Sequence, residues 1–414
     1  MGSAIAQHIF WVDCKIALKL LTLLCALILC GAITLWQPSG GLACSVPELP
    51  GNAVNILDYG ATSNAFDDTV SIQAAVDATP EGGTLYVPPG YFLVNPDNGG
   101  IWLHSNMTLL LAEGAILQAL PSNKPWYSVV VLSNVENVTV AGGTIRGERY
   151  DHVGSEGEWG HVLGIWSSRN IFISNVNIKD AFGDGIYIAD NPDTGGFTKN
   201  VNMCNVVSDN NRRAALSVVG ADGVIVDKCR FSRTNGTAPQ TGIIIEPDPG
   251  QSVSNVTVRN SQVINNLGYG IYVDALEGWV GSNAIENCSI VNNGTDGINI
   301  VQAIKTRIIR NFIENNGGDH LWMAGIKLQE ALGSHVEWNN IRDDEKINRR
   351  GLVIGYGEST GERIIGNDIC TLVSALALLD FSDDRKAKLD RNTYCKRDGH
   401  SKNEEFKFLP LLLK

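Results

Sequence analysis

Short runs in which apolar and polar residues alternate fill most of the chain after residue 52, and the runs are separated by asparagine and glycine. Alternation with a period of two is typical of β-strands with one buried face. No part of the repeating region is long enough to form the crossover helix of a βαβ unit. The pattern therefore predicts an all-β protein built from short strands and tight turns.

The strands belong to a repeat with steps of 26 to 30 residues. A segment of the form Gly-Ile-x-Ile recurs, and its first residues are Gly185, Ala215, Gly242, Gly270, Gly297, Gly325 and Gly351. A steady period of this length indicates a solenoid in which each repeat forms one coil. Residues at the same repeat position then lie about 4.8 Å apart on successive coils. We expect one single-stranded parallel β-helix over residues 52–384.

One turn of the repeat carries paired asparagines, at 265–266, 292–293 and 315–316. Asparagine tolerates left-handed backbone dihedrals, and its side-chain amide can bond to the next coil. We interpret these pairs as structural.

Three segments depart from the repeat. Residues 67–78 have an acidic start followed by apolar residues at helical spacing (Val70, Ile72, Ala75 and Val76), which predicts a helix that caps the first coil. Residues 146–161 form a loop insertion rich in aromatic and histidine residues. Residues 385–414 lose the pattern and are interpreted as a distal cap and tail.

Residues 1–44 have the character of a targeting segment. Lys15 and Lys19 precede an uncharged stretch from Leu20 to Trp36, and small residues follow up to Ala43. Such a segment is a cleavable signal peptide or an uncleaved membrane anchor, and the sequence leaves both open. In either case we expect an exported protein, secreted or held at the cell surface, that meets a membrane only through this segment.

The cysteines outside this leader are widely scattered. The repeat places Cys229 and Cys288 at one inward position two coils apart, so we expect buried thiols. Cys370 and Cys395 near the end of the repeat could form a disulfide.

The segment "VNILDYGATSNAFDDTVSIQAAVDATPEGGTLYVPPGYFLV" (residues 54–94) resembles the opening of pectate-lyase-like and polygalacturonase-like β-helices and of mannuronan C5-epimerases. "NMTLLLAEGAILQA" and "ENVTVAGGTIRGE" continue in the manner of polygalacturonases, and the similarity covers most of residues 52–300. The resemblance implies a right-handed parallel β-helix of the pectate lyase superfamily that acts on a polysaccharide.

The candidate catalytic residues are carboxylates. Glu246 and Asp274 follow Gly242 and Gly270 by the same four residues, so they are expected to stack on adjacent coils. Two close carboxylates repel each other, which raises the pKa of one and suits a pair of acid and base. In the epimerase resemblance, Glu246-Pro247-Asp248 stands where that family has Asp-Pro-His, and Asp274 where it has a further catalytic Asp.

Asp248 and Asp184 are expected to assist this pair, with the alternative that Asp184 is a turn residue. Arg212 and Arg213 lie one coil earlier and could hold a sugar carboxylate, with the alternative that they are solvated and pair with Asp209. The remaining residues predicted to bind substrate are outward or loop residues: Tyr187, Tyr272, Trp159 and His161.

Charge and composition restrict the classes of ligand that we expect the protein to bind. The net charge of −12 argues against nucleic acid. Asp180 and Asp190 are possible calcium ligands, although no calcium-loop motif is present and no cofactor is required. Capped ends give no reason to expect more than a monomer.

Hydrolysis of a polysaccharide is the favoured reaction, because carboxylates outnumber candidate lysine, histidine and tyrosine bases. The chain has no Gly-His-Gly motif of polygalacturonases. Lyase or epimerase action on a uronate polymer is one alternative, and a non-catalytic, adhesin-like surface module that binds glycans is another.

Overall fold

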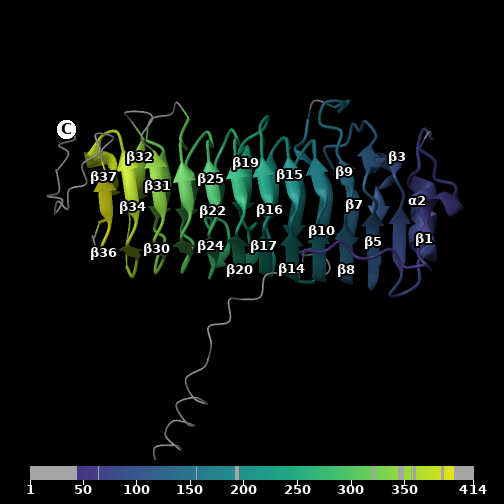
Figure 1. Cartoon of the computed structure of the whole chain (residues 1–414), viewed down its shortest axis with the longest axis horizontal. Coiled ribbons are helices and arrows are strands. Elements are labelled where there is room, and N and C mark those ends of the chain that lie inside the picture. Colours follow the sequence, from purple (N-terminus) through teal and green to yellow (C-terminus); the bar gives the residue numbers. More distant parts are fainter. Residues whose placement is uncertain are drawn as a thin grey trace, which may run out of the picture. The chain divides into compact units, whose positions relative to one another are not determined.

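The structure is a computed structural model that describes residues 44–395, except 64, 155, 192–194, 319–321, 344–348, 356, 358–359 and 384–386. Residues from Cys44 onward form one compact unit, in which the coils of a parallel β-helix stack in a row (Figure 1). Of the predicted leader, residues 1–43 lie outside the described residues and only Cys44 is described. Among the residues described, no helix is long and apolar enough to cross a membrane. The prediction of an all-β parallel solenoid is confirmed.

Each coil contributes strands to three sheets, which are counted here for the described residues. Sheet A has fourteen strands: β1 (Val54–Asn55), β2 (Thr84–Val87), β5 (Met107–Leu111), β8 (Glu136–Ala141), β11 (Arg169–Ser174), β14 (Lys199–Cys204), β17 (Ala221–Asp227), β20 (Ser252–Arg259), β23 (Trp279–Gly281), β24 (Ala284–Glu286), β27 (Arg307–Ile309), β30 (His335–Glu337), β33 (Arg363–Ile365) and β36 (Lys388–Asp390). Sheet B has twelve: β3 (Gly90–Val94), β6 (Ala115–Ala119), β9 (Thr144–Arg146), β12 (Asn177–Lys179), β15 (Val207–Asp209), β18 (Arg230–Ser232), β21 (Gln262–Ile264), β25 (Ser289–Val291), β28 (Phe312–Glu314), β31 (Asn340–Asp343), β34 (Asp368–Thr371) and β37 (Thr393–Cys395). Sheet C has eleven: β4 (Ile101–Trp102), β7 (Trp126–Ser133), β10 (Trp159–Trp166), β13 (Ile186–Ala189), β16 (Ala214–Val218), β19 (Thr241–Ile245), β22 (Ile271–Asp274), β26 (Ile298–Val301), β29 (Ala324–Gln329), β32 (Arg350–Ile354) and β35 (Leu378–Asp380).

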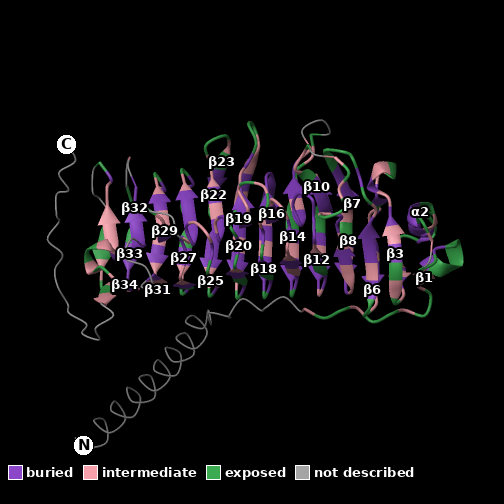
Figure 2. Cartoon of the chain, turned by 90° about the horizontal axis from the view of Figure 1, so that it is seen from above, coloured by how far each residue is buried: buried purple, intermediate pink, exposed green. Residues whose placement is uncertain are grey.

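The core is a stack of aliphatic side chains inside the coils. In sheet C, Ile186 pairs with Leu216, and the same register continues through Ile243 and Ile271 to Ile298. All five side chains are fully buried, and buried residues run along the strands of successive coils (Figure 2). Each inward residue therefore packs on its equivalents in the coils before and after it, which explains the period of the sequence.

Helical elements are short and few in the described chain: α2 (Thr69–Ala78), η1 (Ile56–Tyr59), η2 (Pro96–Asn98) and η3 (Ser374–Leu376). The helix α2 occupies the residues for which the sequence predicts a helix and contacts η1, β1 and β4. Its buried side chains include Ile72, Ala75 and Val76, whereas Val70 is exposed and was wrongly placed on the apolar face. That α2 caps the solenoid stays a prediction.

The two asparagines of each pair have different structural roles. Asn265, Asn292 and Asn315 take left-handed dihedrals, whereas their neighbours point inward and bond from coil to coil. Asn293, for example, donates from Nδ2 to Oδ1 of Asn316 at 2.9 Å and accepts from Nδ2 of Asn266 at 2.9 Å. The structural interpretation of the asparagine pairs is confirmed.

Two disulfides lie in the described chain. Cys370 and Cys395 are bonded, as the sequence allowed, and Cys229 and Cys288 are buried free thiols as predicted. A second bond joins Cys44 to Cys204 at the end of β14. In Figure 1 the purple segment before β1 accordingly runs along several coils.

The solenoid extends beyond residue 384, where we predicted its end. Strands β36 and β37 pair in parallel with β33 and β34. The sequence boundary was too early because it followed the apolar pattern, whereas parallel pairing depends on backbone hydrogen bonds.

Candidate functional site

The predicted carboxylate pair lies at the ends of two neighbouring strands of sheet C. Ile245 at the end of β19 is in register with Val273 of β22, so the next residues, Glu246 and Asp274, are adjacent. The side chains of both are partly exposed. The structure thus brings together the two residues that the repeat alignment singled out.

Arg213 connects this pair to a buried carboxylate. Its Nη1 lies 3.2 Å from Oδ2 of Asp184, and its Nη2 donates to Oε1 of Glu246. The Arg213 side chain is 12% exposed and that of Asp184 is inaccessible. The alternative that Arg213 is solvated and pairs with Asp209 is wrong, because Asp209 pairs with Arg233.

Burial controls the charge states under the site. It raises the pKa of Asp184 to about 6 although Arg213 opposes the shift, and it raises the pKa of Glu246, again against Arg213 and with help from Asp274 and Asp248. Burial and the Arg213 charge lower the pKa of His161 to about 3. Because neutral His161 accepts the Asp184 backbone N–H at Nδ1, at 3.3 Å, the two form no ion pair at neutral pH.

Two site predictions need correction. Asp184 is fully buried and does not reach a substrate, so it is a positioning residue for Arg213 rather than a catalytic one. His161 is also buried, with its ring stacked on Tyr187 at 4.3 Å between centroids. Its burial keeps it from binding sugar or exchanging protons with it.

The outward tyrosines lie beside the pair. Tyr187, Ser217, Ile244 and Tyr272 occupy one register position on successive coils. The Tyr272 hydroxyl donates to Oδ2 of Asp274 at 2.6 Å, and the ring stacks on that of Tyr269 at 4.5 Å. Tyr272 is therefore placed to orient Asp274.

The insertion 146–161 is fastened over the coils next to the site. Arg149 donates to the backbone carbonyls of Asn210, at 2.8 Å, and Asn235, at 2.6 Å, which lie two and three coils beyond its own. Arg212 donates to the carbonyl of Gly157 at 2.8 Å and stacks on Phe182. Predicted as a substrate ligand, Arg212 instead helps to hold the insertion.

Trp159 opens β10 and is 46% exposed, as a sugar-stacking residue would be. Its register partner on β7, Trp126, is 71% exposed. The sequence analysis missed Trp126, although an exposed tryptophan one coil before Trp159 is visible once the strands are aligned. Both lie at the starts of their strands, away from Glu246 at the end of β19.

A buried cluster that includes two residues of the insertion was also missed. Glu148 accepts from the Tyr127 hydroxyl and is hydrogen-bonded to Nδ1 of His152 at 2.7 Å. The His152 ring stacks on Phe182 at 3.5 Å. The contact between Glu148 and His152 could not be predicted from their spacing of four residues, because the insertion has no regular secondary-structure period.

The predicted calcium ligands do not converge. Asp180 bonds to Arg146 at 2.6 Å and to Asn210, and Asp190 accepts the backbone N–H of Thr198 at 2.6 Å. Within the described ranges, the one group with metal-like geometry is Asp368 with Cys370 and Cys395, whose cysteines form a disulfide. The structure therefore gives the calcium hypothesis no support.

The Asp184 carboxyl should leave a pH signature in stability. Its folded pKa of about 6 lies above the ordinary 3.8, so the folded state binds the proton more tightly. Its contribution is most favourable below about pH 4 and weakens by up to about 3 kcal/mol as pH rises past 6. Urea unfolding at pH 4.5 and 7.5 should show this loss in the wild type and not in Asp184→Asn. Parallel pH dependence in both proteins would contradict the assignment.

Comparison with known families supports the fold. The model of the family described as right handed beta helix region matches residues 127–301 and 241–393. The chain belongs to this family. The handedness expected from the sequence resemblance is thereby confirmed.

The individual proteins to which this chain is similar in sequence are of several kinds. The uncharacterized protein YclG of Bacillus subtilis is 28% identical over 266 residues, or 53% of this chain and 44% of YclG. An exo-poly-alpha-D-galacturonosidase of Dickeya chrysanthemi is 43% identical over 65 residues, 16% of this chain and 10% of that protein. The chain thus spans less than half of these curated relatives.

Solved structures share the fold at low identity. The A-module of the mannuronan C-5 epimerase AlgE6 of Azotobacter vinelandii has a TM-score of 0.54 and 16% identity, over 82% of this chain and 99% of the module. The surface adhesin PfbA of Streptococcus pneumoniae has a TM-score of 0.58 and 18% identity, over 83% and 90%. The fold is therefore one used by polysaccharide-active enzymes and by adhesins.

Proposed function

We propose that this protein is a carbohydrate-active enzyme that hydrolyses a polysaccharide at Glu246 and Asp274. The observation that carries the proposal is the adjacency of these two partly exposed carboxylates, one of which is held by a buried arginine. A glycosidic bond needs an acid on its leaving oxygen and a carboxylate on the other side of the sugar ring.

The surroundings of the two carboxylates assign their roles. Burial and the charges of Asp274 and Asp248 raise the pKa of Glu246, which favours Glu246 as the proton donor. Its Oε1 accepts from Arg213, so the transferred proton belongs on Oε2. Asp274 accepts from the Tyr272 hydroxyl and from the backbone N–H of Leu276 at 3.0 Å, which suits the ionised partner. Exposed Asp248 adds negative charge beside them.

Export is part of the proposal. Two disulfides, Cys44–Cys204 and Cys370–Cys395, support an oxidising compartment. A polysaccharide substrate outside the cell would agree with this location. Mass mapping of the disulfides in the protein from its native host tests it.

Glu246→Gln is expected to lower turnover at least about a hundredfold, because the amide cannot donate the proton. The full-length protein and the variant are incubated with neutral and uronate polysaccharides, and products are separated by chromatography with ultraviolet detection. New reducing ends that disappear in the variant would support hydrolysis.

The matched control is Glu314→Gln, since Glu314 is a partly exposed glutamate at the end of β28 in sheet B, a different sheet from the site; it should retain full turnover. Products with ultraviolet-absorbing unsaturated ends would show that the protein is a lyase rather than a hydrolase. If no polysaccharide of the panel is altered, including alginate checked for epimer content, glycan binding without catalysis becomes the better hypothesis.

A further inference from the structure

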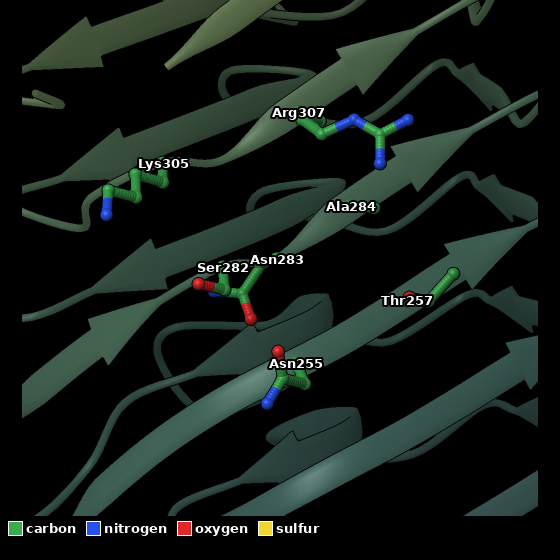
Figure 3. A pocket seen from close by; sticks show the side chains of 7 residues that line it. All are labelled: Asn255, Thr257, Ser282, Asn283, Ala284, Lys305 and Arg307. Carbon is green, nitrogen blue, oxygen red and sulfur yellow. The ribbon is translucent and has the colours of Figure 1, made fainter. Parts of the chain in front are cut away.

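A polar hollow of about 340 Å³ lies on the outer face of sheet A. Its walls come from three successive coils: Asn255 and Thr257 from β20, Ser282 and Asn283 from the next coil, and Lys305 and Arg307 from the coil after that. Figure 3 shows the two basic side chains on one side, the β20 residues on the other, and Ser282 with Asn283 between them. Glu246 and Asp274 belong to the end of sheet C, so this is a separate place on the protein.

A break in one strand forms the hollow. β20 is continuous over Ser252–Arg259, but it pairs with two short strands, β23 and β24. Ser282 interrupts them with a left-handed φ of 60°. At the register position between Thr257 and Arg307 stands Ala284, whose methyl group leaves the space open.

The lining offers mainly hydrogen-bond donors. Lys305 is exposed, and Arg307 forms an ion pair with Glu286 at 2.8 Å while its side chain remains 56% exposed. Asn283 at the floor is 2% exposed, and its Nδ2 has no hydrogen-bond partner among the described residues. The groups that a ligand in the hollow would meet first are therefore the exposed Lys305 and Arg307.

The hollow is one end of a basic column. Arg307 is in register with His335, His335 with Arg363, and Arg363 with Lys388, on successive coils of sheet A. Glu337 lies near His335 and Arg363 at 3.7 and 3.5 Å and balances part of this charge. In a protein with a net charge of −12, four successive coils thus carry a basic side chain at one position, beside a parallel row that holds Glu286, Glu337 and Asp390.

We propose that the hollow and the basic column, Lys305 and Arg307 to Lys388, bind a uronate polysaccharide as an accessory site. Arg307 presents a planar fork that fits a carboxylate. The hydroxyl and amide groups of Ser282, Thr257 and Asn255 fit the hydroxyl groups of the same sugar. A linear polymer with one carboxylate per sugar can place successive charges over successive coils, which are about 4.8 Å apart.

This inference deepens the proposed function, on which it rests for the polysaccharide ligand, by naming the class of polymer. The test is titration calorimetry of the full-length protein with hexagalacturonate and with cellohexaose, which has the same length and no charge. We expect binding of the uronate alone, weakened about tenfold or more in the double variant Lys305→Ala, Arg307→Ala, because two charge contacts are lost.

Arg169→Ala is the matched control, since Arg169 is an exposed arginine of sheet A paired with Glu136; its affinity should equal that of the wild type. Glu246→Gln should also bind normally, so loss of turnover and loss of binding are separate results. Binding of hexagalacturonate that the double variant leaves unchanged would overturn the proposal, as would equally tight binding of cellohexaose or of a short DNA duplex. Thermal unfolding of each variant checks that the fold is retained.

Discussion

Replacing Arg213 with alanine is expected to destabilise the protein by about 4 kcal/mol at pH 8, the cost of removing one partner from a buried ion pair. Arg213 bonds to Asp184, which is inaccessible to solvent, and to Glu246, whose side chain is 29% exposed. Without the guanidinium, only the hydrogen bonds from Ser217 and from the Ala214 backbone oppose the effect of burial, so the pKa of Asp184 rises further. The measurement is the free energy of unfolding in urea.

The same variant should lose less stability at pH 5 than at pH 8. Asp184 then takes up a proton, and a neutral buried carboxyl costs less than an unpaired charge. Arg212→Ala is the control: its guanidinium stacks on Phe182 and bonds to backbone carbonyls rather than to carboxylates. Its smaller loss should not depend on pH. An Arg213→Ala loss under about 1 kcal/mol at both pH values would show that Arg213 is not the centre of a buried charge cluster.

The repeat made the backbone predictable, together with everything that depends on register. Equivalent positions of a solenoid become neighbours, so a count of residues placed Glu246 beside Asp274 and Cys229 in line with Cys288. It also identified the asparagine pairs as structural, although only the structure separates the left-handed Asn292 from the inward Asn293. The repeat does not predict the contacts of a side chain that reaches from its own coil to another one.

Several of the residues that were misjudged or missed depend on such contacts. Arg149 reaches three coils beyond its own, and Cys44 bonds to a cysteine 160 residues away. Asp184 was predicted to assist catalysis, but its burial depends on contacts with the insertion and with the Arg213 side chain, and the repeat does not predict these contacts. A sequence can show that a carboxylate stands on the right coil without showing which atoms cover it.

The second large effect is expected from the asparagine ladder. Asn293→Ala should destabilise the protein by about 4 kcal/mol. The Asn293 side chain donates to the Val263 carbonyl at 3.1 Å and to Asn316, and its Oδ1 accepts from the backbone N–H and the Nδ2 of Asn266. Alanine would leave buried polar groups unpaired on both neighbouring coils, at about 1–3 kcal/mol for each.

Asn292→Gly is the matched control for this prediction, because Asn292 has the same side chain one residue earlier but is exposed, with a left-handed φ of 56°. Glycine adopts that conformation without strain, so the stability should change by less than about 0.5 kcal/mol. Urea unfolding followed by circular dichroism compares the two variants. If Asn293→Ala and Asn292→Gly had equal stabilities, the inward amides would be dispensable and aliphatic stacking alone would hold the coils in register. A loss confined to Asn293→Ala would instead show that the inward amides contribute to stability in addition to the aliphatic stack.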